Sequence, residues 1–134
     1  MKNSIYNFGL LVLRVVSGAM MFVLHGVPKM GMIIKGEFGA FPNPIGLGSA
    51  LSLYLSGLAE TLIALFLIIG FMTRFSAFIL AFNMLIAVYW HYSMGNGGTE
   101  LPLIYLAMYV TIILVGGGNV SVDNTIQRWK ISKK

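Results

Sequence analysis

The stretch Leu47–Ile69, LGSALSLYLSGLAETLIALFLII, decides the fold of this chain. Apart from one acidic residue, Glu60, it contains only apolar, small or hydroxyl-bearing side chains. A helix that crosses a bilayer needs about 20 mostly apolar residues, so this stretch is long enough to span one. An ionised carboxylate near the centre of such a span costs at least about 2.5–3.5 kcal/mol. Glu60 must therefore be neutralised, paired, or turned into a polar cavity.

The composition places the chain among integral membrane proteins. Hydrophobic residues make up 57% of its 134 residues and charged residues only 10%, whereas soluble domains average about 25% charged residues. The length fits one domain, residues 1–134. The net charge of +5 comes from basic residues dispersed at segment ends, which favours contact with anionic membrane lipid and argues against nucleic acid as a partner. The chain has no cysteine, so it supplies no disulfide, thiolate nucleophile or iron–sulfur cluster.

The hydropathy pattern predicts an all-α membrane protein, a bundle of four transmembrane helices. The expected helices cover about residues 5–26, 47–70, 74–92 and 100–116, followed by a basic tail at 119–134. Residues 26–46 contain three prolines and several glycines. We therefore expect no long helix through them, but a segment that lies in the interface or folds back over the bundle.

The distribution of basic residues predicts the orientation. Six would share one side of the membrane (Lys2, Arg74, Arg128, Lys130, Lys133 and Lys134) and two the other (Lys29 and Lys35). This excess predicts cytoplasmic termini and a multi-pass protein of the cell inner membrane.

Each expected helix carries one polar side chain near the middle of the membrane. At 1.5 Å per residue, Arg14, Glu60 and Asn83 lie about 14–15 Å from the inner ends of their helices, and Tyr109 about 10 Å. All four share a face with small or polar residues, which predicts a core pocket that they line together. Arg14 and Glu60 are expected to form an ion pair, which either fixes the helix register or takes part in chemistry.

Two histidines and two further charged residues complete the set of candidates. His25 and His91 are expected near the outer end of the bundle, where the pocket would open. We favour a role as interface anchors for them, with axial ligation of a haem as the alternative. Lys29 is expected to be an interface anchor, and Asp123 to cap a short helix in the tail.

Several short motifs, taken in order, resemble the DoxX family. They are Arg14…Gly18…His25-Gly26…Lys29, Glu60 with IIGFMTR at 68–74, Asn83–Ala87, Glu100…Tyr105, and GGGNVSVD at Gly116–Asp123. The resemblance implies a four-helix inner-membrane protein linked to oxidoreductase assemblies. It also implies a relative of the thiosulfate:quinone oxidoreductase membrane subunit, and partners in thiol and oxidative-stress defence.

The leading functional hypothesis is a quinone-interacting membrane subunit of a redox complex. In this hypothesis Glu60 accepts or relays a proton and Arg14 or His25 donates to a quinone carbonyl. The catalytic candidates are Glu60 and Arg14, and the cofactor-binding candidates are Arg14, His25, Asn83, His91 and Tyr109.

Other functions remain open at the level of sequence. Because the chain has no redox centre of its own, other subunits would carry the electrons, and it need not itself be an enzyme. One alternative is a non-catalytic scaffold that recruits soluble redox enzymes through residues 119–134, and another is a small-solute transporter. Assembly into a homo-oligomer is a further expectation.

Overall fold

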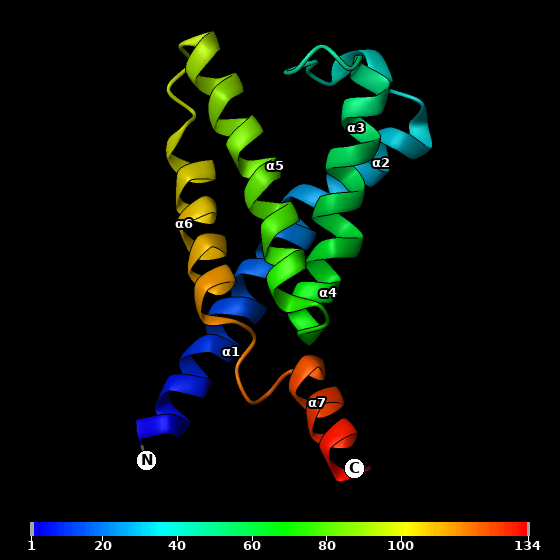
Figure 1. Ribbon diagram of the computed structural model, residues 1–134. Helices are drawn as coiled ribbons and strands as arrows, with labels where there is room; N and C mark the ends of the chain where they lie inside the picture. Colours follow the sequence, from blue (N-terminus) through cyan, green and yellow to red (C-terminus); the bar gives the residue numbers. More distant parts are fainter. Residues whose placement is uncertain (1, 134) are drawn as a thin grey trace.

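The computed structural model describes residues 2–133, and helices are the only regular elements in that range (Figure 1). Three helical runs are long and apolar enough to cross a membrane: Asn3–Lys35, Ser49–Ile69 and Thr73–Met94. Large apolar side chains cover their outward surfaces, as expected where helices face lipid. The predicted class of all-α membrane protein is therefore confirmed. Met1 and Lys134 lie outside the described residues. Lys134 is one of the six basic residues on which the predicted orientation rests.

The first helical run is longer than the sequence predicted. It consists of α1 (Lys2–Met20), the π-helical η1 (Met21–Gly26) and α2 (Val27–Lys35), which follow without a break. The expectation that no long helix runs through residues 26–46 is therefore wrong for residues 26–35, which are helical. Pro28 lies in the first turn of α2, directly after the wide π turn, where its missing N–H is tolerated.

The length of this run explains its placement in the bundle. Its 33 residues extend about 50 Å at 1.5 Å per residue, well beyond a hydrocarbon core of about 30 Å. A helix that exceeds the bilayer thickness accommodates by tilting. Figure 1 shows α1 crossing the other helices obliquely.

Seven further helical elements follow the first run within the described residues. They are the short 3₁₀ turn η2 (Phe38–Ala40), α3 (Ser49–Leu58), the π-helical η3 (Ala59–Ile63), α4 (Ala64–Ile69), α5 (Thr73–Met94), α6 (Glu100–Val115) and α7 (Val122–Ser132). The two ends of the chain lie at the same end of the bundle, while the α5–α6 pair and the α2–α3 pair diverge toward the opposite end (Figure 1). The inward face predicted for the last apolar helix is confirmed, since Pro102, Tyr105, Tyr109 and Ile112 are its buried residues.

The tail is attached to the bundle through Asp123. Asp123 lies in the first turn of α7, as predicted, but the hydroxyl of Ser121 caps this helix, so the predicted capping role of Asp123 there is wrong. The Asp123 carboxylate instead accepts 2.8 Å bonds from the backbone N–H groups of Met72 and Thr73, and a 2.7 Å bond from the Thr73 hydroxyl. These N–H groups begin α5, and a carboxylate is favoured at such a position because it satisfies unpaired donors at the positive end of the helix dipole.

Candidate functional site

The carboxylate of Glu60 is held by side chains from three helical runs. It pairs with the ammonium group of Lys29 on α2. One of its oxygens, Oε1, accepts a 2.8 Å hydrogen bond from the side-chain amide of Asn83 on α5 and a 3.1 Å bond from the hydroxyl of Ser56 on α3. The Glu60 side chain is only 4% exposed. An opposite charge and two neutral donors together offset the cost of burying this carboxylate.

Two π-helical turns bring the pair together. In η1 and in η3, the residue after the turn donates its N–H to a carbonyl five residues earlier. The two turns touch at Gly26, where a Cβ would overlap the backbone carbonyl of Glu60. Only glycine allows the helices to approach this closely. π-helical turns occur frequently at functional sites, and here one of them supplies Glu60 while the other immediately precedes α2 and Lys29.

A cavity of about 240 Å³ lies against this ion pair, between α3 and α5. Its polar lining residues are Lys29, Ser52, Ser56, Glu60, Asn83 and His91. Its apolar lining residues are Phe41, Pro42, Pro44, Ile45, Leu47, Leu55, Ile86, Ala87 and Trp90. A 150 Å³ apolar cavity is large enough to bind benzene, so this cavity can admit a substituted six-membered ring.

Arg14 does not reach Glu60. Its side chain is buried, and the guanidinium donates to the backbone carbonyls of Ile68 (3.2 Å), Val120 (2.6 Å) and Gly117. The fork of donors on an arginine suits such a cluster of carbonyls, here where α4 ends and the chain turns toward α7. The predicted Arg14–Glu60 pair is therefore wrong.

The register of the first helical run explains this error. Gly26 rather than Arg14 lies beside Glu60. Because the helix continues to Lys35, Lys29 follows Gly26 by about one turn and reaches the carboxylate. Arg14 lies at the α4–α5 turn, within contact distance of Gly70. Lys29 occupies the place expected for Arg14, so its predicted role as a simple interface anchor is also wrong.

The other predicted residues divide into two groups. Asn83 and His91 line the cavity with Glu60, and His91 Nδ1 lies 3.1 Å from the side-chain oxygen of Asn96. His25 lies outside the lining, with its ring edge-on to Tyr105 at 5.7 Å between centroids. Tyr109 also lies outside it, fully buried in the core.

Two signals in the sequence could have identified the residues that were missed. Lys29 follows His25 by four residues and continues the inward face of the first helix, but Pro28 concealed it by suggesting a helix end. Ser52 and Ser56 precede Glu60 by eight and four residues, a spacing that places all three on one helix face.

The fold and the site define a small helical membrane protein with a cavity at a buried ion pair. The DoxX family model matches residues 9–93, and the chain belongs to the DoxX family. The matched range includes the ion pair and Asn83. The DoxX-like motifs after residue 93 lie outside it.

Two proteins of Haemophilus influenzae (strain ATCC 51907 / DSM 11121 / KW20 / Rd) are similar to this chain, and both carry the name "Uncharacterized protein". One is 32% identical over 117 residues, which cover 79% of this chain and 82% of the relative. The other is 33% identical over 96 residues, covering 66% of this chain and 62% of that relative. No solved structure gives a significant match.

Proposed function

We propose that this protein is a membrane subunit of a redox complex whose cavity at Lys29 and Glu60 holds the ring of a quinone. The observation that carries the proposal is a buried ion pair at one wall of a cavity whose other walls are mainly apolar. A ligand with an apolar ring and a polar oxygen matches both parts of this surface. The 240 Å³ volume accommodates a ring but not a long isoprenoid tail, which would extend out of the cavity.

The residues at the ion pair keep donors for a ligand oxygen. An ammonium group has three N–H donors and a side-chain amide has two, whereas Lys29 and Asn83 each donate one to Glu60. Lys29 thus replaces Arg14 as the donor to a quinone carbonyl. Glu60, in hydrogen-bond contact with both donors, is the group that accepts or relays a proton.

A bound quinone would supply the capacity to take up two electrons and two protons. The chain contains no cysteine, and we propose that a partner subunit delivers the electrons. The chain's own share is to bind the ring, to orient it by Lys29 and Asn83, and to hold a proton at Glu60.

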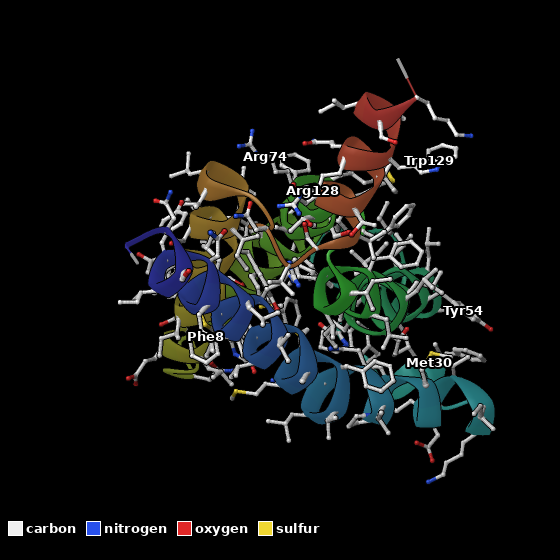
Figure 2. All side chains as sticks on the ribbon, turned by 90° about the horizontal axis from the view of Figure 1, so that it is seen from below. Phe8, Met30, Tyr54, Arg74, Arg128 and Trp129 are labelled. Atoms are coloured by element: carbon white, nitrogen blue, oxygen red, sulfur yellow. The ribbon has the colours of Figure 1, made fainter. Side chains whose placement is uncertain are left out.

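We further propose four spans with both termini cytoplasmic. Both ends of the chain lie at one end of the bundle (Figure 1), where Arg74 lies in the first turn of α5 and Arg128 on α7; Figure 2 looks onto this end. Two basic residues, Lys29 and Lys35, lie on the proposed outer side, which the excess of basic residues in the cytoplasm disfavours. Lys29 is neutralised by Glu60, so Lys35 is the main one that remains. α6 has 16 residues, about 24 Å, so the bilayer would thin slightly around it. A periplasm-only reporter fused after the last residue should stay silent, and activity of the reporter would refute the orientation.

Quinone binding can be measured through Trp90, which lines the cavity. The chain has two tryptophans, and the other, Trp129, lies exposed on α7. In purified full-length Trp129→Phe protein, tetramethyl-p-benzoquinone should quench Trp90 fluorescence saturably. Lys29→Met should raise the dissociation constant obtained from this quenching at least tenfold, because the ring loses its charged donor. Lys35→Met, which removes an exposed lysine from the same helix, is the matched control and should bind normally.

The same titration separates the proposal from its alternatives. Absence of saturable quenching, or equal quenching in Lys29→Met, would refute a quinone site at the ion pair. Capture of soluble redox proteins that depends on residues 119–134 would then favour the scaffold. Uptake of a small solute into vesicles would favour the transporter.

A further inference from the structure

The hydroxyl of Ser52 is a polar group that the protein itself does not satisfy. Ser52 is 8% exposed, and its Oγ has no hydrogen-bond partner among residues 2–133. Leaving a buried hydroxyl unpaired is unfavourable, so a partner from outside the chain is expected. Ser52 also lines the cavity at the ion pair.

The helix offers Ser52 an alternative that it does not take. Hydroxyls in apolar helices commonly bond to the carbonyl four residues earlier. Thr61 and Thr111 do so in this chain, with bonds of 2.6 and 2.8 Å to Gly57 and Ala107. The corresponding carbonyl for Ser52 accepts the backbone N–H of Ser52 but not its hydroxyl.

The position of Ser52 relative to the ion pair sets the shape of the missing partner. Ser52, Ser56 and Glu60 follow one another at four-residue spacing, so they lie on one helix face. The carboxylate of Glu60 reaches back to the hydroxyl of Ser56. Ser52 therefore lies one further turn away, about 6 Å along the helix axis.

From this geometry we propose that Ser52 hydrogen-bonds the distal oxygen of a para-substituted ring whose first oxygen faces Lys29 and Asn83. This inference rests on the proposed function and extends it, because it requires a ligand with two opposed oxygens. A serine hydroxyl both donates and accepts. It can donate to a quinone carbonyl and accept from a quinol hydroxyl, so one residue serves both redox forms. Ser52 is thus the residue that selects for the second oxygen.

Two ligands that differ only in the distal oxygen test this role. Tetramethyl hydroquinone, kept reduced under anaerobic conditions, carries both oxygens, and tetramethylphenol carries one. Their dissociation constants are measured by calorimetry with the full-length protein in detergent. Ser52→Ala should weaken binding of the hydroquinone about three- to tenfold and leave binding of the phenol unchanged. Ser49→Ala is the matched control, because it removes a serine hydroxyl from the same helix outside the cavity lining. It should change the dissociation constant of neither ligand.

Thermal unfolding of the ligand-free variants provides a second readout. Ser52→Ala removes an unpaired hydroxyl, so its melting temperature should equal or exceed that of the wild type. A lower melting temperature would mean that the hydroxyl has a partner within the protein, which overturns the proposal. The proposal would also be overturned if Ser52→Ala weakened binding of both ligands equally, or of neither. In that case, quinone binding that still depends on Lys29 would leave the proposed function standing. If the wild type bound neither ligand, the proposed function would fail and this inference with it.

Discussion

Breaking the Lys29–Glu60 pair should destabilise the fold by amounts that depend on which partner is removed. Lys29→Met leaves a carboxylate that is 4% exposed, with only the neutral donors of Ser56 and Asn83. Removing one partner of a buried pair typically costs about 3–5 kcal/mol, and these two donors place the expected loss near 3 kcal/mol. Glu60→Gln leaves an ammonium that is 17% exposed on a flexible stem, so the expected loss is about 1–2 kcal/mol.

The free energy of unfolding can be measured by SDS titration of the full-length protein in mixed micelles. The double variant Lys29→Met with Glu60→Leu should recover most of the loss, because a well-packed apolar pair can replace a buried ion pair. Lys35→Met and Glu37→Gln remove exposed charges nearby and should each stay within about 0.5 kcal/mol of the wild type. Small and equal losses in both single variants, or a double variant worse than either, would refute this account of the pair.

Three other contacts give predictions that the same titration checks. Arg14→Lys should lower the free energy of unfolding by about 2–3 kcal/mol, because a compact ammonium does not span the three separate carbonyls that the planar guanidinium reaches. Gly26→Ala should cost about 1–3 kcal/mol, since the added methyl overlaps the backbone carbonyl of Glu60. Asp123→Ala should cost about 1–2 kcal/mol and speed hydrogen exchange at the start of α5, because two N–H groups lose their acceptor.

These variants have controls of their own. Gly31→Ala places a methyl where no atom lies within 4 Å and should be close to neutral. Arg14→Lys should leave quinone affinity unchanged, since Arg14 lies outside the cavity lining, and a large loss of affinity would place Arg14 at the ligand after all. Exchange at the start of α5 that is unaffected by Asp123→Ala would rule out the capping contact.

Properties that depend on local sequence could be predicted without the structure. Composition and hydropathy identify an all-α membrane protein, because a chain with 10% charged residues cannot cover itself with polar surface. Helical periodicity identified the buried face of α6, since that face depends only on a repeat of 3.6 residues. The apolar length of Leu47–Ile69 showed that Glu60 needs a partner within the membrane.

The identity of that partner was decided by tertiary structure alone. It depends on the helix continuing past Pro28 and on the depth at which two helices meet, and a shift of a few residues exchanges Lys29 for Arg14. The same holds for Asp123, which caps a helix some 50 residues away in sequence, and for the unpaired hydroxyl of Ser52. Hydropathy and periodicity describe one helix at a time, whereas register between helices is set by close packing, here at Gly26 against Glu60.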